Sequence, residues 1–243
     1  MNAMEQARKR WNAIAKPLHS LGRLEDLIVQ IAGVQDTPDV RIDKRCALVF
    51  CGDHGVVREG VSQSDSEVTA LVAKSIAEGT GNINLMADAA QADVFAVDMG
   101  MMTPVPGTID RRMGAGTANM TEGPAMSREQ AEKAVQAGID LVSDLQKQGY
   151  QIAVIGEMGI GNTTAASAIA SVLLDMPVEP VTGRGQACPT QDWQEKSRPS
   201  NGRSKSTSLT GTTPWTCWRS WGALRSRAWP GHIWVDTGII SPR

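Results

Sequence analysis

A glycine-rich segment at residues 156–164 carries the clearest chemical signal in this sequence. It reads GEMGIGNTT and stands between an apolar run and an Ala-rich stretch typical of a helix. Its glycines can adopt positive φ and allow a ligand to approach the backbone. The N–H groups and the dipole at a helix start attract anions, most often phosphate. The segment therefore predicts a phosphate-binding turn, although a turn that merely joins a strand to a helix has the same composition.

The segment differs from the common phosphate-binding motifs. No Lys follows its last glycine, so it is not a Walker-type loop, and its glycine spacing departs from the dinucleotide-binding fingerprint. Glu157 places a carboxylate inside the turn, which is unfavourable beside an anion unless that carboxylate has a task of its own. Accepting hydrogen bonds from ribose hydroxyls would be such a task. Glu157 therefore favours a nucleotide over a connecting turn.

Other residues that could take part in catalysis or binding lie in or directly after two apolar runs. Asp53-His54 could act as an acid–base or metal-binding pair, but no second ligand stands at a fitting spacing, so we predict no metal. Asp98 ends a strand-like run, and we expect it to face a ligand. Cys46 and Cys51 flank an apolar run and are interpreted as buried thiols. No G-x-S-x-G segment supports a serine hydrolase.

The elements that would position these residues alternate along the chain. Apolar runs predict buried strands at 46–51, 94–97 and 152–155. Amphipathic or Ala-rich stretches predict helices at 4–16, 23–34, 66–78, 82–90, 127–147 and 165–174. This alternation predicts an α/β fold with a parallel sheet. Ligands of such sheets gather at the carboxyl ends of the strands, where all the candidate polar residues fall.

The composition excludes some functions. The formal net charge is −2, which gives no sign of a nucleic-acid-binding surface. No apolar stretch reaches the roughly 18 residues that a membrane-spanning helix needs. The N-terminus (MNAMEQARKRWNAIAK) carries charges where a signal peptide would have an apolar core. We therefore expect a cytoplasmic protein with neither nucleic acid nor membrane as a partner.

Four segments together resemble one enzyme family. They are KPLHSLGRLEDLIVQIAGVQ (16–35), VFCGDHGVVREGVSQSDSEVT (49–69), GNINLMADAAQADVFAVDMGM (81–101), and GEMGIGNTTAASAI (156–169) followed by TGRG (182–185). The family is that of nicotinate-nucleotide–dimethylbenzimidazole phosphoribosyltransferase, which serves the synthesis of the cobalamin lower ligand. The resemblance implies transfer of phosphoribose from nicotinate mononucleotide to 5,6-dimethylbenzimidazole, giving α-ribazole 5′-phosphate and nicotinate, with no metal or cofactor.

The resemblance also implies an architecture. A Rossmann-like α/β domain would occupy residues 36–185, and residues 1–35 would form the N-terminal helical part of a small domain that is built from both chain ends. The family is a homodimer.

Site residues follow from the same resemblance. The mononucleotide would contact residues matching the family's glycine-rich segments: Glu157, Gly159, Gly161, Asn162, Thr163 and Gly185. Ser62, in the loop 60–69, is the best match to a benzimidazole-binding residue. Ser64 and Asp65 replace the more usual Tyr-Pro, which puts the base preference in question. The family's general base is a Glu in a Gly-Glu-Gly-type segment near the C-terminus, and this chain has no such segment, so no catalytic residue is assigned.

Residues 186–243 do not continue this pattern. They hold six of the seven tryptophans, which is unlike a disordered tail, and a novel small domain is another interpretation. A reading-frame error accounts for the composition of this segment better than a disordered tail or a novel small domain does. Read from the third base of each codon, residues 186–197 can decode as TGLSDTGLARKI and residues 213–231 as PMDVLAKLGGFEIAGMAG, close to what the family carries after its Gly-Arg-Gly. We hypothesise a frameshift directly after Gly185.

Three functional hypotheses remain. The first is a phosphoribosyltransferase by family, which we expect to be inactive as written because the general base is missing. The second is a nucleotide-binding module without catalysis, supported by the retained segment 156–164. The third is an unrelated hydrolase using Asp53-His54, which lacks an accompanying nucleophile.

Overall fold

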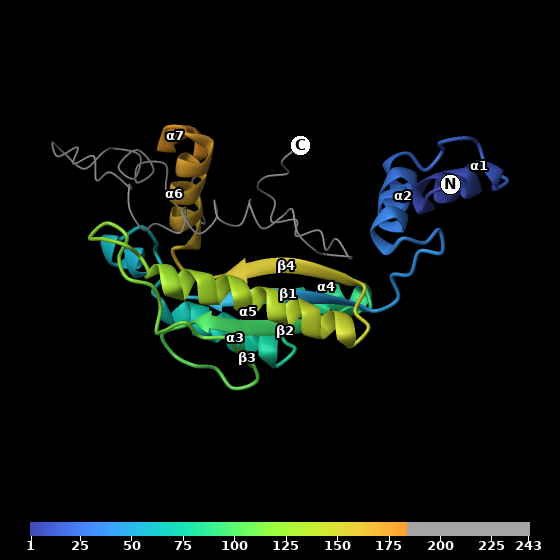
Figure 1. The fold of residues 1–243 in the computed structure, drawn as a ribbon. Coiled ribbons are helices and arrows are strands. Elements are labelled where there is room, and N and C mark those ends of the chain that lie inside the picture. The colour runs from blue at the N-terminus through green and yellow to red at the C-terminus, as the bar shows by residue number, and fades with distance from the viewer. Residues whose placement is uncertain (184–243) are drawn as a thin grey trace.

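A parallel four-stranded sheet forms the centre of the molecule, with the order β3-β2-β1-β4 (Figure 1). The computed structural model describes residues 1–183, so the predictions for the tail 186–243 lie outside the described residues. The strands are β1 (Arg45–Gly52), β2 (Asp93–Gly100), β3 (Ile109–Asp110) and β4 (Ile152–Met158). The predicted α/β fold with a parallel sheet is confirmed.

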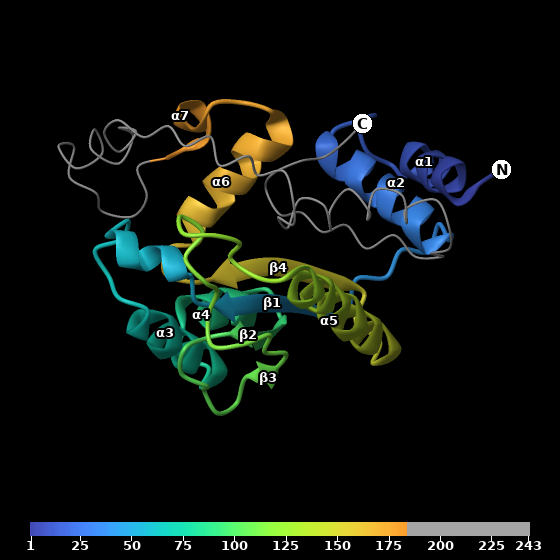
Figure 2. The ribbon, with the colours of Figure 1, turned by 60° about the vertical axis from the view of Figure 1, so that its left-hand side comes forward.

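Helices cover both faces of this sheet. Figure 2 shows α3 (Glu67–Ala77) and α4 (Asn82–Ala89) on one face and α5 (Arg128–Lys147) on the other. The alternation of side chains along β1 explains the two layers, because successive residues of a strand point to opposite faces. Val49 packs in the core on the side of α3, whereas Leu48 packs in the core that includes Leu141 of α5.

The N-terminal helices form a separate pair. α1 (Ala3–Ala13) and α2 (Arg23–Gln35) pack against each other through a small core of Ala7, Val29 and Ala32. Both views place the pair away from the sheet (Figures 1 and 2). The helix predicted at 4–16 ends three residues earlier, at Ala13.

The strand β4 is longer than the sequence predicts. It runs through Gly156 and Glu157, which pair in register with Val49 and Phe50 of β1. Glycine and glutamate disfavour strands locally, but the parallel hydrogen bonds with β1 outweigh that preference. The predicted turn is therefore shorter, and it spans residues 159–161.

The helix α6 (Asn162–Leu174) begins directly after this turn, three residues before the predicted start. It leaves the sheet at the ends of the strands, as Figure 1 shows. Two short helices were not predicted, η1 (Gly55–Glu59) after β1 and α7 (Val178–Val181) after α6.

Candidate functional site

The carboxyl ends of three strands meet at one edge of the sheet. Cys51 near the end of β1 pairs with Asp98 of β2 on one side and with Met158 of β4 on the other. Asp53, Asp98 and Glu157 therefore lie at the same edge, as the parallel topology predicts. All three carboxylates contribute, after burial, to raising the pKa of the Cys51 thiol to about 12. The edge is acidic, and the thiol beneath it is buried and protonated.

The turn at residues 159–161 packs closely against the segment that follows β1. A Cβ on Gly159 would overlap the carbonyl oxygen of Gly52, so this position has no room for a side chain. Gly161 has φ +89°, in the left-handed region, and a Cβ there would lie 2.8 Å from Cγ2 of Val57. Among the three glycines of the predicted turn, Gly156 lies in the strand and only Gly161 has positive φ.

The N–H groups at the start of α6 are mostly engaged within the turn. The Asn162 N–H donates to the Gly159 carbonyl (3.0 Å), and the Thr164 N–H donates to the Gly161 carbonyl (3.1 Å). The Thr163 N–H donates to Oδ1 of Asn162 (2.7 Å). The turn and the first residue of the helix therefore supply partners for these three N–H groups. Within residues 1–183, the Gly161 N–H has no hydrogen-bond partner.

Glu157 is exposed at the end of β4, beside the start of α6. Its Oε1 accepts a hydrogen bond from the side-chain amide of Asn162. The other oxygen, Oε2, has no protein partner among the described residues. Because the side chain is held at one oxygen and exposed, it can accept hydrogen bonds from ligand hydroxyls.

His54 lies against the same turn. Its Nε2 would be 3.1 Å from a Cβ on Gly159, and its own Cβ would be 3.3 Å from a Cβ on Gly161. Burial lowers the pKa of the imidazole below its ordinary 6.5, while the negative charges of Glu157 and Asp53 act in the opposite direction. His54 is therefore a neutral imidazole at pH 7, in contact with the turn that precedes α6.

The two aspartates of this edge have different surroundings. Asp98 is 1% exposed, and its oxygens accept hydrogen bonds from the N–H groups of Gly100 (2.9 Å) and Met101 (2.8 Å) and from the Arg112 guanidinium (2.7 Å). The expectation that Asp98 faces a ligand is wrong, because the loop after β2 folds around this carboxylate. Asp53 accepts from the Met102 N–H at Oδ2 (2.7 Å).

Sequence reasoning missed several polar residues that brace this edge. Oγ1 of Thr69, a fully buried residue of α3, accepts a hydrogen bond from the Ile160 N–H (3.1 Å) in the turn. Farther along the same edge, Oε1 of Glu59 accepts from the Asn119 amide (2.6 Å) and the Thr121 hydroxyl (3.1 Å). Thr69 belongs to the amphipathic pattern of its helix, so no local signal separates it from an ordinary core residue.

Ser62, another predicted site residue, takes part in a different hydrogen bond. The Ser62 hydroxyl accepts a hydrogen bond from the Ser64 N–H (3.2 Å), which shapes the loop after η1. Gly185 lies outside the described residues. The predicted buried thiols are confirmed, since Cys46 and Cys51 are free and buried.

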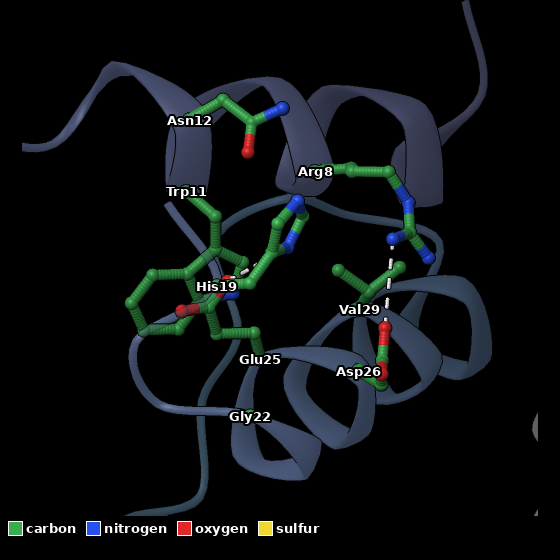
Figure 3. Close-up of a pocket in the computed structure, with 8 residues that line it drawn as sticks. All are labelled: Arg8, Trp11, Asn12, His19, Gly22, Glu25, Asp26 and Val29. Carbon is green, nitrogen blue, oxygen red and sulfur yellow. Dashed lines mark hydrogen bonds and ion pairs between the residues drawn. The ribbon is translucent and has the colours of Figure 1, made fainter. Parts of the chain in front are cut away.

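A separate pocket of about 190 Å³ lies between α1 and α2 (Figure 3). Its floor includes Glu25, which is 6% exposed and accepts hydrogen bonds from Lys16 Nζ (2.7 Å) and the Leu21 N–H (3.1 Å). The Lys16 interaction holds the pKa of Glu25 below its ordinary value. The Glu25 carboxylate thus holds the turn between the two helices. Nδ1 of His19 lies 3.9 Å from Oε2 of Glu25.

Residues 1–183 lack two further features. No group of three or more His, Cys, Asp and Glu side chains is arranged to hold a metal ion in this part of the chain. No helix there is both long and apolar enough to cross a membrane.

The fold is that of an α/β protein with its candidate site at the carboxyl ends of a parallel sheet, and comparison with known proteins gives its family. A family model described as phosphoribosyltransferase matches residues 1–223, and the chain belongs to this family. The match extends beyond Gly185, the position of the hypothesised frameshift.

Several relatives carry one name. Nicotinate-nucleotide–dimethylbenzimidazole phosphoribosyltransferase of Pseudomonas fluorescens is 45% identical over 185 residues, which cover 75% of this chain and 53% of the relative. The protein of that name from Desulforamulus reducens is 42% identical over 197 residues, covering 79% and 56%. The crystal structure of CobT from Thermus thermophilus is similar with a TM-score of 0.74 and 36% identity, covering 80% of this chain and 60% of that chain. The chain spans about half the length of the curated relatives it matches.

Proposed function

We propose that the carboxyl edge of the sheet is the mononucleotide-binding part of a site for phosphoribosyl transfer from nicotinate mononucleotide to 5,6-dimethylbenzimidazole. In the proposed reaction the products are α-ribazole 5′-phosphate and nicotinate, within cobalamin synthesis. The observation that carries the proposal is the tight turn 159–161, which joins an exposed strand-end carboxylate, Glu157, to the start of a 13-residue helix.

The proposed roles follow from the chemistry of each group. The Gly161 N–H and the positive end of the α6 dipole would bind the phosphate, with Asn162 and Thr163 beside it and Gly159 allowing close approach. Oε2 of Glu157 would accept hydrogen bonds from the ribose. Displacement at the anomeric carbon builds positive oxocarbenium character, which the acidic edge would stabilise. Ser62 would border the benzimidazole, and Gly185 would complete the mononucleotide site.

The proposal extends to the rest of the chain. We infer a homodimer, with residues 1–35 as part of a small helical domain and 36–185 as the nucleotide-binding domain. We attribute residues 186–243 to a shifted reading frame. Resequencing the gene across codons 180–190 tests this: an uninterrupted frame, with no insertion or deletion relative to homologous genes, would overturn it.

Binding and catalysis can be separated by experiment. Calorimetry with nicotinate mononucleotide should show binding to the full chain that weakens by roughly tenfold in Glu157→Gln, the loss expected for one charge-assisted hydrogen bond. Glu179→Gln is the matched control, because Glu179 is exposed on α7, and α7 lies beyond the end of α6 that is farther from the sheet (Figure 1). Absence of binding to the unsubstituted chain would refute the proposed mononucleotide site.

A second candidate function is nucleotide binding without transfer. The observation that favours it is the absence of a Gly-Glu-Gly segment from the chain as written. We expect no α-ribazole 5′-phosphate when the purified chain is incubated with both substrates. Detection of that product by mass spectrometry would reject the binding-only candidate and leave the transferase.

A further inference from the structure

We propose that His54 is a positioning residue of this site. Its imidazole sets the position of the turn 159–161 and thereby orients both the carboxylate of Glu157 and the start of α6. Neither the proposed mononucleotide contacts nor the proposed chemistry uses this residue.

The turn is closely packed against the end of β1 and the residues that follow it. The Gly52 carbonyl faces Gly159, and the His54 side chain faces both Gly159 and Gly161. The imidazole faces Gly159, where an added Cβ would lie 3.1 Å from Nε2, and the His54 Cβ faces Gly161, where an added Cβ would lie 3.3 Å away. A ring of fixed shape that fills this space determines how far the turn can move toward β1.

The turn is also connected to α3 and to β1. The Ile160 N–H is held by Thr69 Oγ1 (3.1 Å), so α3 fixes the middle of the turn. The residues on either side of Ile160 are the two glycines, which have no side chains to anchor them. His54 lies beside both glycines, together with the Gly52 carbonyl at Gly159 and with Val57 at Gly161. It stands two residues after β1, the strand that is hydrogen-bonded to β4.

Protonation of the imidazole would change this contact. Glu157 at the end of β4 and Asp53 at the end of β1 are the charged groups that act on His54. A charged imidazole would be drawn toward the Glu157 carboxylate, which Asn162 now holds through Oε1. Acidification should therefore shift the turn, the carboxylate and the helix start together.

Nuclear magnetic resonance of the full chain tests the inference without any substrate. As the pH is lowered from neutrality and the His54 ring titrates, the amide signals of Gly159 and Gly161 should follow the signals of that ring. His54→Asn should abolish this dependence, and His54→Gln provides a second variant if the first does not fold. His19→Asn is the matched control, because His19 is exposed in the α1–α2 turn. Glycine signals that ignore the His54 titration, or that still follow pH in the His54 variants, would overturn the inference.

Nicotinate mononucleotide provides a second measurement, which rests on the proposed function. His54→Asn should weaken binding by about 10- to 100-fold, the range typical for loss of a supporting residue, and should flatten its pH dependence. The His19→Asn variant should bind like the unsubstituted chain. Equal affinity of His54→Asn at every pH would overturn the positioning role. If the unsubstituted chain does not bind the mononucleotide while the glycine signals still follow His54, the proposed function fails and the positioning role stands.

Discussion

Gly159 and Gly161 are both needed at the turn, but for different physical reasons. Gly159 has no space for a Cβ because the Gly52 carbonyl occupies that position. Gly161 has a backbone conformation that other residues adopt at a cost of roughly 1 kcal/mol or more. The sequence shows glycine at both positions. The reasons for glycine differ, because the Gly52 carbonyl packs against Gly159 whereas Gly161 has positive φ.

Substitution of Gly159 by Ala tests the contact with the β1 end. The added methyl group meets backbone rather than a flexible side chain, so we expect the free energy of unfolding to fall by about 1–3 kcal/mol. Urea denaturation measures this. Gly138→Ala is the control: Gly138 lies within α5 with open space around its Cα, so this change should stabilise the chain by about 0.5–1 kcal/mol. An unchanged midpoint for Gly159→Ala would contradict the close approach of the two strand ends.

At the scale of elements, some helix and strand ends are determined by neighbouring residues and others by pairing with a distant strand. The residues at the start of α5, SREQ at 127–130, have the local sequence pattern of a capping box. The structure contains its two hydrogen bonds: the Ser127 hydroxyl accepts from the Gln130 N–H (3.1 Å), and Gln130 Oε1 accepts from the Ser127 N–H (2.9 Å). The end of β4 has no such local signal. Pairing with β1 carries the strand through Glu157, and this places the carboxylate just before the turn proper.

Removal of the Ser127 hydroxyl should destabilise α5 without touching the site. We expect Ser127→Ala to lower the free energy of unfolding by about 1 kcal/mol, since one orphan N–H loses its partner. Thermal unfolding followed by circular dichroism reports the loss. Ser143→Ala, within the same helix, should change stability by less than about 0.5 kcal/mol. Equal losses in the two variants would show that the cap does not stabilise this helix.

At the scale of the whole molecule, the described sheet ends in two edge strands, the two-residue β3 and the seven-residue β4. β4 pairs with β1 on one side, and no strand of the described part pairs with its other side. Val154 on β4 is 58% exposed, and the neighbouring α6 exposes Ile169 and Leu174. An unpaired edge strand with exposed apolar side chains is a template for association between chains.

Charge on the β4 edge should improve solubility. Val154→Lys places a cation on the exposed β4 strand and opposes edge-to-edge pairing. We expect less light scattering during concentration of the protein, with little change in the unfolding midpoint. Leu71→Lys is the control, because Leu71 is similarly exposed (64%) but lies on α3. If both variants reduce scattering equally, general charge rather than the strand edge governs association.

The sequence by itself determined the strand–helix alternation, the position of the glycine-rich turn and the capping box of α5. Each of these depends on local periodicity or on residues within a few positions of one another, and that information is contained in a short stretch of chain. The same local reasoning correctly placed Asp98 near the end of a strand. It could not show that the Asp98 carboxylate accepts hydrogen bonds from Arg112 and from two backbone N–H groups.

Only the tertiary structure decided how the turn 159–161 is held. Its supports come from Gly52, His54 and Thr69, roughly 90 to 110 residues earlier in the chain, and they reach the turn because β1 and β4 are adjacent parallel strands. Contacts across that separation depend on strand order and register, which no local pattern encodes. The sequence therefore predicted the turn but not the contacts that hold it in place.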